Sequence, residues 1–399
     1  MTFKKLVGKL HLWLGLGSGL VVFIVSITGC IYVFSQEIHQ FVDREVLEVP
    51  ASSSGTRLPA SVLWEKAAQA LGEDRPIGWA SQYRDPKASW SYSTYQPNPE
   101  ALTYFGALEK YESVYLDPYT GEVLGFIDHK YDFFNIVKFL HWSLLLNTPY
   151  GQPIVGWSTF IFVILLISGM ILWWPKNKKA RKQRFTVKWN ARWRRVNYDL
   201  HNVLGFYIAS MALILAFTGM VWAFTWFKGL VYVAASGTTT PPDMSQAVST
   251  PLTSPVSSNP MDLSMEQVWK IYPEAYCARL YMPADSTGII MARVQQLPGV
   301  YYKSSEMQFD QYSAELLKHR RHEDKNTGEK LITANYDIHV GAILGIPGKI
   351  LAFFASLICA SLPVSGFMIW WGRRKKSKQK SKTPQKKKIN PTAQMATTG

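Results

Sequence analysis

The sequence predicts an α-helical membrane protein with four transmembrane helices arranged as a tandem two-helix repeat, and with an α+β module outside the membrane in each repeat. Three observations support this fold class. Four stretches are long and apolar enough to span a bilayer and contain no Asp, Glu, Lys or Arg. The mean hydropathy of the 399 residues is nevertheless close to zero, so a large part of the chain lies in water. The two halves of the chain also share motifs in the same order.

The four apolar stretches set the order of the elements, because a bilayer core takes about 20 apolar residues. These stretches are residues 10–34, 154–174, 203–227 and 350–371. With their flanks, the predicted transmembrane regions are 1–35, 139–175, 199–228 and 336–372, and the second and fourth each begin with a short helix on the outer surface. The predicted outer modules are 36–138 and 229–335, and the remaining segments are a basic loop at 176–198 and a basic tail at 373–399.

The first span contains a motif with two incompatible interpretations. Ile27-Thr28-Gly29-Cys30 resembles a lipobox, which would place a cleavage site before Cys30. The apolar core of a leader peptide has roughly 7 to 15 residues, whereas here the apolar run starts at Leu10 and continues beyond the cysteine. We therefore predict that this helix stays in the membrane.

The charges outside the spans are sorted by segment. The N-terminus, the 176–195 loop and the 373–388 tail contain 23 of the 43 Lys and Arg residues, whereas the two long segments contain 27 of the 28 Asp and Glu residues. By the positive-inside rule, both termini face the cytoplasm and both modules face outward. A basic excess confined to helix flanks needs only the membrane, so we do not expect nucleic-acid binding.

Motifs recur at matched positions in the two halves. A Thr-Gly pair follows His11 and His201 at the same distance, 17 residues. A proline follows His141 and His339 after eight residues, and the next spans end in SGMILWWPK and SGFMIWWGR. Because each repeated unit crosses the membrane twice, the copies have the same orientation and are related by a pseudo-two-fold axis along the membrane normal.

The outer segments repeat more faintly. VYLDPYTGEVL from Val114 and MQFDQYSAELL from Met307 both predict a strand, an Asp-x-Tyr turn and a second strand. The Ser-, Thr- and Pro-rich residues 235–260 predict a flexible linker. Several aromatic residues are candidates either for lining a substrate pocket or for half-buried strands, and alternation such as SWSYSTY favours strands. These residues are Trp90, Tyr92, Tyr95, Tyr301 and Tyr302.

The repeat arranges four histidines in two pairs. The pseudo-symmetry brings His11 opposite His201 near the cytoplasmic face, and His141 opposite His339 near the outer face. Two imidazoles that face each other across an axis suit axial ligation of a haem. A helix from His11 to Phe34 covers about 35 Å, which is too far for one haem to serve both faces. A lone histidine at an interface is usually a snorkelling or capping residue, but four at matched places favour two haem sites.

Residues beside the histidines have structural and functional interpretations. Small residues on the helix face that follows His11 and His201 either make room for a porphyrin edge or allow a close helix contact. Asp199 and Asp337 each precede a histidine by two residues, and this spacing favours a helix N-cap over a hydrogen bond to the imidazole. The small residues are Gly15, Gly19, Gly205 and Ala209.

These motifs, in this order, resemble the PepSY-associated transmembrane proteins. The resemblance covers nearly the whole chain and rests on KLHLWLGLGSG from Lys9, LDPYTGEVLG from Leu116, the His141-Trp142 pair and SGMILWWPK from Ser168. It implies PepSY-like outer modules in a bacterial inner-membrane protein. Members of the family include ferric-siderophore reductases with two b-type haems. The resemblance implies that His11 and His201 ligate the inner haem and that His141 and His339 ligate the outer one.

The function implied by the resemblance is transfer of electrons across the membrane to ferric siderophore iron in the periplasm, for iron uptake. Reduction would release the iron, because hard-oxygen chelators hold the ferrous ion more weakly. The chain has no flavin or nicotinamide domain, so the electron donor is expected to be a cytoplasmic reductase or a quinol. The expected partners are this donor, the ferric siderophore and the lipid bilayer.

Two other functions remain open from the sequence. One is a quinol-linked b-type cytochrome whose outer acceptor is not siderophore iron. The other is a non-redox protein, either a PepSY-type regulator or a divalent-metal permease that uses the histidines.

Overall fold

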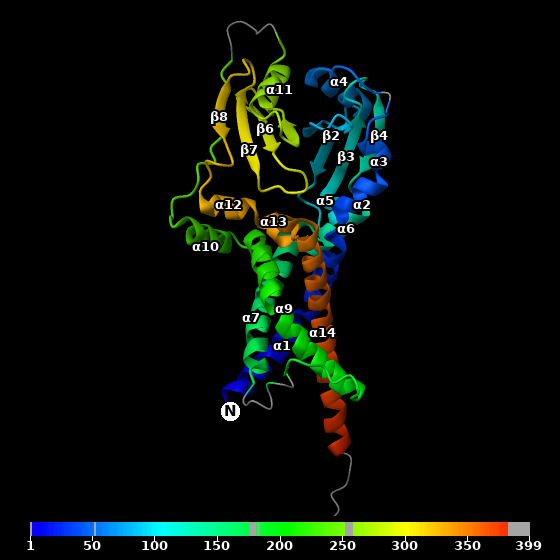
Figure 1. Ribbon diagram of the computed structural model, residues 1–399, viewed down its shortest axis with the longest axis vertical. Helices are drawn as coiled ribbons and strands as arrows, with labels where there is room; N and C mark the ends of the chain where they lie inside the picture. Colours follow the sequence, from blue (N-terminus) through cyan, green and yellow to red (C-terminus); the bar gives the residue numbers. More distant parts are fainter. Residues whose placement is uncertain (1, 52, 176–180, 182–183, 252–257, 382–399) are drawn as a thin grey trace, which may run out of the picture.

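Four helices of the computed structural model are long and apolar enough to cross a membrane, and they form a bundle below a β-sheet (Figure 1). The structure describes residues 2–51, 53–175, 181, 184–251 and 258–381, with side chains up to residue 374. Each of the four helices corresponds to one of the apolar stretches in the sequence. They are α1 (Phe3–Tyr32), α7 (Thr148–Trp173), α9 (Trp193–Ala223) and α14 (Gly345–Ser381).

The bundle is a four-membered ring of helices. Helix α1 packs against α7 and α14, and α9 packs against the same two helices. The helices that the predicted pseudo-two-fold axis relates, α1 to α9 and α7 to α14, are therefore diagonal partners across the bundle. Apolar side chains such as Leu20, which is 72% exposed, and Phe354, which is 54% exposed, point away from the bundle and are compatible with a lipid bilayer. Helix α1 is continuous through Cys30.

The two long segments between the spans form one open antiparallel sheet of eight strands, in the order β4-β3-β2-β1-β5-β6-β7-β8. The central strands β1 and β5 pair with each other, with Ser81 opposite Arg279. The sequence predicted a module in each segment, and the structure joins both segments in a single sheet. The strands are β1 (Trp79–Tyr83), β2 (Trp90–Pro97), β3 (Leu108–Leu116), β4 (Val123–Asp128), β5 (Cys277–Tyr281), β6 (Ile289–Gln295), β7 (Ser304–Asp310) and β8 (Leu316–Arg320).

One face of the sheet is covered by α4 (Ala60–Leu71) and α11 (Pro260–Ile271). The two helices are joined because the backbone N–H and the hydroxyl of Ser61 donate to the Asp262 carboxylate. Trp90 and Tyr92 are part of the apolar core under these helices. The strand interpretation of these two residues is therefore confirmed, and they do not line an open pocket.

Both predicted hairpins are confirmed. Strands β3 and β4 pair around a turn in which the Asp117 carboxylate accepts the N–H of Tyr119 at 2.8 Å, and β7 and β8 pair around a turn with the same contact from Tyr312 to Asp310 at 2.8 Å. The carboxylate satisfies backbone donors that the turn leaves unpaired, which explains the Asp-x-Tyr pattern.

Short helices lie between the bundle and the sheet (Figure 1). Two of them, α6 and α13, precede α7 and α14, as predicted for the second and fourth transmembrane regions. Pro149 and Pro347 lie in the first turns of α7 and α14, where proline is tolerated. The short helices are α2 (Ser35–Val42), α3 (Arg44–Leu47), α5 (Tyr104–Ala107), α6 (Phe133–Ser143), α10 (Thr225–Ser236), α12 (Thr327–Thr333), α13 (Asn335–His339) and the 3₁₀ helix Ala342–Leu344.

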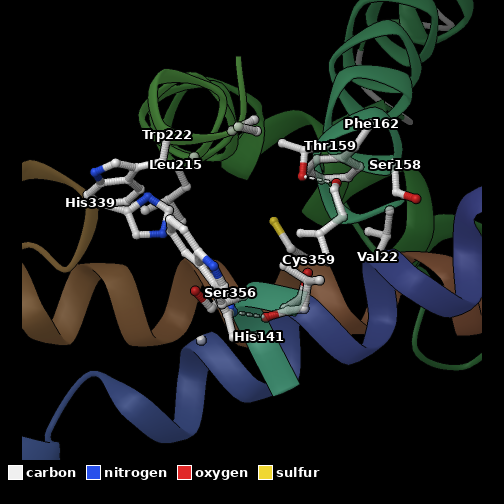
Figure 2. Close-up of a pocket in the computed structure, with 18 of the residues that line it drawn as sticks. Val22, His141, Ser158, Thr159, Phe162, Leu215, Trp222, His339, Ser356 and Cys359 are labelled. Carbon is white, nitrogen blue, oxygen red and sulfur yellow. Dashed lines mark hydrogen bonds between the residues drawn. The ribbon is translucent and has the colours of Figure 1, made fainter. Parts of the chain in front are cut away.

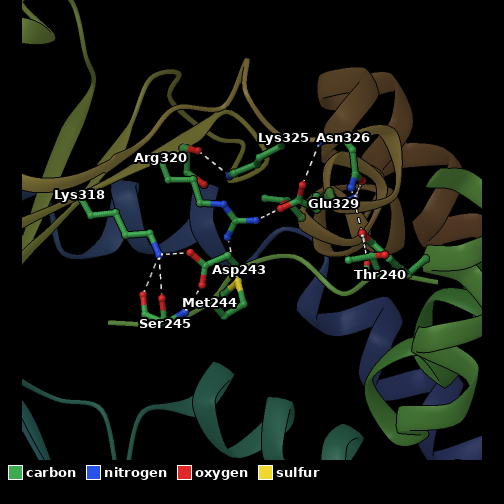
Figure 3. A network of polar contacts seen from close by, with 12 residues as sticks. Thr240, Asp243, Met244, Ser245, Lys318, Arg320, Lys325, Asn326 and Glu329 are labelled. Atoms are coloured by element: carbon green, nitrogen blue, oxygen red, sulfur yellow. Dashed lines mark hydrogen bonds and ion pairs between the residues drawn. The ribbon is translucent and has the colours of Figure 1, made fainter. Parts of the chain in front are cut away.

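The predicted linker at 235–260 is held against the sheet over part of its length. The Lys318 ammonium on edge strand β8 binds the Asp243 carboxylate at 2.7 Å and the Ser245 carbonyl at 2.9 Å (Figure 3). Further along, the N–H of Thr250 donates to Asp310 at 2.8 Å. Residues 243–250 of the predicted linker therefore contact the sheet, and residues 252–257 lie outside the described residues.

Candidate functional site

The side chains of His141 and His339 meet (Figure 2), on helices that lie at the end of the bundle that carries the sheet (Figure 1). His141 lies on α6 and His339 on α13, and their ring centroids are 6.0 Å apart. The structure therefore brings these two histidines together, as the sequence predicted. Trp222 packs edge-on against His339, with the ring centroids 5.2 Å apart.

Hydrogen bonds fix the orientation of both imidazoles. Nδ1 of His141 donates to the Val25 carbonyl at 2.8 Å, and Nδ1 of His339 lies 2.8 Å from the Thr218 hydroxyl. That hydroxyl donates to the Ile214 carbonyl at 2.7 Å, so it accepts the proton of His339. With the proton on Nδ1, the lone pair of each ring is on Nε2, which is the arrangement that metal-ligating histidines adopt.

His11 and His201 lie toward the opposite end of the bundle and make matching hydrogen bonds. Nδ1 of His11 lies 2.8 Å from the Ser168 hydroxyl, and Nδ1 of His201 lies 2.9 Å from the Ser365 hydroxyl. Both hydroxyls donate to carbonyls of their own helices, so they accept from the imidazoles. Among the described side chains these two rings make no direct ring contact, and no hydrogen bond reaches the Nε2 atom of any of the four histidines.

A glycine follows the hydroxyl residue beside each histidine. A Cβ atom on Gly29 would lie 3.1 Å from Cε1 of His141, and the other three glycines have the same relation to their histidines. The Thr-Gly and Ser-Gly pairs align the two repeats in the sequence, but the sequence alone gives no sign of their contact with the imidazoles. The other distances are 3.3 Å from Gly366 to His201, 3.4 Å from Gly169 to His11 and 3.7 Å from Gly219 to His339.

The earlier glycines in these helices have a different role. A Cβ atom on Gly15 would lie 3.7 Å from Leu165 of α7, and one on Gly19 would lie 3.5 Å from Pro363 of α14. These positions face neighbouring helices at ordinary contact distance. The structure therefore favours the close-helix interpretation of this strip.

The imidazoles of His141 and His339 line a cavity of about 470 Å³ inside the sheet half of the bundle (Figure 2). Its volume is in the range of cofactor and small-molecule sites. Most of the wall is apolar, with side chains such as Val22, Phe162 and Ala212. Polar side chains that line it include Tyr32, Lys138, Gln152 and Tyr336.

Lys138 is the lysine among the side chains that line this cavity. It lies three residues before His141 on α6, so both side chains are on the same helix face. Burial lowers the pKa of Lys138 to about 8, an effect that the Asp132 carboxylate opposes. Its ammonium lies 5.0 Å from the centroid of the Phe139 ring, and no carboxylate forms an ion pair with it in the part of the chain that the structure describes.

The interpretation of the two acids as N-caps is wrong. Asp199 lies inside α9, where it pairs with Arg195 at 2.9 Å. Asp337 lies inside α13 and accepts the backbone N–H groups of Tyr301 and Tyr302, at 3.0 and 2.7 Å. Asp337 thus fastens the β6–β7 hairpin to the helix that carries His339.

The residues of the sheet-end pair fit a haem. The ring centroids of His141 and His339 are 6.0 Å apart, and these two imidazoles are the residues that would hold the iron of a haem. The Nε2 atoms are free of hydrogen bonds within the described residues, and the adjoining cavity is apolar. Imidazole nitrogen is a ligand of haem iron, so this donor set and the apolar cavity fit a haem.

Comparison with known proteins identifies the family of the chain. No curated protein matches the chain. The family model described as the PepSY-associated TM region matches residues 9–373. This match includes all four histidines, the whole sheet, all of α7 and α9 and most of α1 and α14. The chain belongs to the family of proteins with a PepSY-associated transmembrane region.

Proposed function

We propose that this protein is a di-haem membrane oxidoreductase that reduces ferric siderophore iron on the side of the membrane where the sheet lies. The observation that carries the proposal is the matched setting of the four histidines. Each Nδ1 atom is held by a hydroxyl or carbonyl group of another helix, and each Nε2 atom is left to bind a metal. One such pair at each end of the bundle provides a redox site near each membrane face.

A b-type haem held at each pair supplies one-electron redox chemistry. At the sheet end, the chain's own contribution is orientation and exclusion of water. The Val25 carbonyl and the Thr218 hydroxyl hold the rings of His141 and His339, and apolar side chains form the cavity wall. At the other end, Ser168 and Ser365 orient His11 and His201 in the same way.

The membrane topology is part of the proposal. The basic 176–195 loop follows α7 in the sequence, the basic tail begins at the end of α14, and these two helices end on the side of the bundle away from the sheet, which by the positive-inside rule is the cytoplasmic end (Figure 1). The sheet is then periplasmic, in a bacterial inner membrane. The paired Ser-Gly and Thr-Gly contacts support a tandem repeat of the two halves, with a pseudo-two-fold axis through the bundle.

The first test is a dithionite-reduced minus oxidised visible spectrum of the detergent-purified protein, with haem quantified per chain. We expect two b-type haems per chain. Absence of haem in protein expressed with ample haem would contradict the proposal and favour a non-redox regulator or permease. Reoxidation of the reduced protein by a panel of ferric chelates, compared with oxygen, then tests the acceptor. Reoxidation by oxygen alone would favour a cytochrome with another acceptor.

A further inference from the structure

The face of the sheet opposite α4 and α11 carries a cluster around Arg279 on central strand β5. Side chains alternate along a strand, so Arg279 points away from Ala278 and Leu280, which lie in the core under the two helices. Ser81 of β1 and Arg293 of β6 are the neighbours of Arg279 in register on this open face. We call the cluster the Arg279 site, which consists of Trp79, Tyr111, Arg279, Tyr281 and Tyr301.

The guanidinium of Arg279 is surrounded by aromatic side chains. It lies 5.9 Å from the centroid of the Trp79 ring, and Trp79 in turn lies 6.5 Å from the ring of Tyr281. Burial raises the pKa values of Tyr111 and Tyr301, and the nearby Arg279 guanidinium opposes the increase in both. The hydroxyl groups of both tyrosines therefore lie close enough to the Arg279 guanidinium to interact with its charge.

Arg279 has no carboxylate partner in the part of the chain that the structure describes. Its Nε atom is buried and makes no hydrogen bond. The adjacent Arg293 provides the contrast, because it lies on the same face, is 53% exposed and pairs with Glu306 at 3.8 Å. The contacts of this partly buried guanidinium with Trp79 and Tyr281 replace only part of the hydration that it loses, and without an anion it presents planar donors suited to an oxygen anion.

The Arg279 site adjoins the cavity of the sheet-end histidines. Tyr301 is held to α13 by Asp337 and packs edge-on against Tyr336, with the ring centroids 5.3 Å apart. Tyr336 lines the cavity and also lies 6.5 Å from the ring of Trp222, which contacts His339. Aromatic contacts therefore lead from the Arg279 site to the proposed outer redox centre.

We propose that the Arg279 site binds the ferric chelate and selects chelates with negative charge, an inference that rests on the proposed function. The guanidinium pairs with deprotonated oxygen donors of the chelate, and the rings of Trp79, Tyr281 and Tyr301 pack against its flat groups. The expected ligand class is an anionic catecholate or carboxylate ferric chelate. A neutral trihydroxamate chelate lacks the charge that Arg279 recognises.

The test uses redox-inert gallium(III) chelates, so that binding is measured without reduction. The probes are gallium tris(catecholate), which is anionic, and gallium tris(acetohydroxamate), which is neutral, titrated into the full-length detergent-purified protein by calorimetry. We expect the anionic probe to bind at least about ten-fold more tightly. Arg279→Gln removes one charge-assisted hydrogen bond, so it should weaken binding of the anionic probe about ten- to hundred-fold. Arg279→Lys keeps the charge and should bind the anionic probe more tightly than Arg279→Gln.

Arg293→Gln is the matched control, because this neighbour is exposed and already paired. Its affinity for the anionic probe should stay within about two-fold of wild type. Equal affinity of wild-type protein for the two probes, or unchanged affinity in Arg279→Gln, would overturn the inference whatever the haem content. Haem content is measured on the same samples, so a protein with two haems and no charge preference would contradict only the Arg279 site. A protein without haem would contradict the proposed function itself.

Discussion

A Cβ atom on Gly29 would lie 3.1 Å from Cε1 of His141, closer than ordinary van der Waals contact. Gly29→Ala should therefore push the His141 ring by a few tenths of an ångström and weaken haem binding at the sheet end. Gly17→Ala is the control, because it lies on the same helix and a Cβ atom there meets nothing within 4 Å. We expect Gly29→Ala to lose part of the sheet-end haem or to shift its midpoint potential. Identical spectra and redox titrations for the two variants would contradict a role of Gly29 in positioning His141.

The pairing of the histidines is tested by combining alanine variants. His141→Ala and His339→Ala should each remove the same haem, so the double variant should retain about one haem per chain. His141→Ala combined with His11→Ala should retain none, because the two residues belong to different pairs. His129→Ala is the control, since His129 is bound to Ser113 on the sheet at 2.8 Å and lies in neither pair. Loss of both haems in the His141→Ala/His339→Ala double variant would refute the pairing.

The spans, their order and the hairpins could be predicted from the sequence because they depend on local patterns. Runs of apolar residues gave the four long helices, and the Asp-x-Tyr turns gave β3–β4 and β7–β8. The pairing of β1 with β5 could not be predicted. The sequences of these strands, WASQY and CARLY, contain no local pattern that specifies a partner strand in the other half of the chain. This single pairing makes one sheet of two predicted modules.

The sequence predicted the histidines of the candidate site, but it did not predict the side chains that contact them. Matched spacing identified His141 and His339, whose rings do meet. The hydroxyl groups of Thr218 and Ser365 looked like ordinary polar residues in apolar helices, and only the packing of neighbouring helices shows that they hold imidazoles. Arg279 carried no signal at all, since an arginine on a strand is usually exposed and paired.

His39 links α2 to α6 and should make stability depend on pH. Its Nδ1 lies 2.7 Å from Asp43 and its Nε2 3.4 Å from Asp132, which also caps α6. The hydrogen bond to Asp132 raises the pKa of His39 to about 9, burial opposes the increase, and Asp43 adds to it. Because the folded pKa exceeds the unfolded one, this stabilisation is full below about pH 6.5 and is lost as the pH rises through 9.

The corresponding measurement is thermal unfolding of wild type and His39→Asn across this pH range. His39 is partly exposed, so solvent screening limits the expected difference to about 0.2–1 kcal/mol at pH 6. The two unfolding temperatures should converge by pH 10. A difference that stays constant with pH would show that His39 contributes packing rather than charge.

Lys138 should destabilise the protein when the cavity holds no anion. Burial lowers its pKa to about 8 from 10.5. The unfolded state therefore binds the proton more strongly, so the penalty is full below pH 8 and falls as the pH rises toward 10.5. Lys138→Met should raise the free energy of unfolding of haem-free protein by about 1–3 kcal/mol at pH 7, and this gain should shrink above pH 8. The exposed Lys270→Met is the control and should change little.

The same variant should have the opposite effect on haem binding. A haem carries carboxylate groups, and the Lys138 ammonium is the cation that lines the cavity beside His141. We expect Lys138→Met to bind haemin more weakly than wild type, and to bind haemin dimethyl ester, which lacks these charges, as tightly as wild type does. Titration of haem-free protein with both compounds measures the difference. If Lys138→Met weakens the binding of both compounds equally, the lysine acts through the shape of the cavity. A charge interaction with the haemin carboxylates is then refuted.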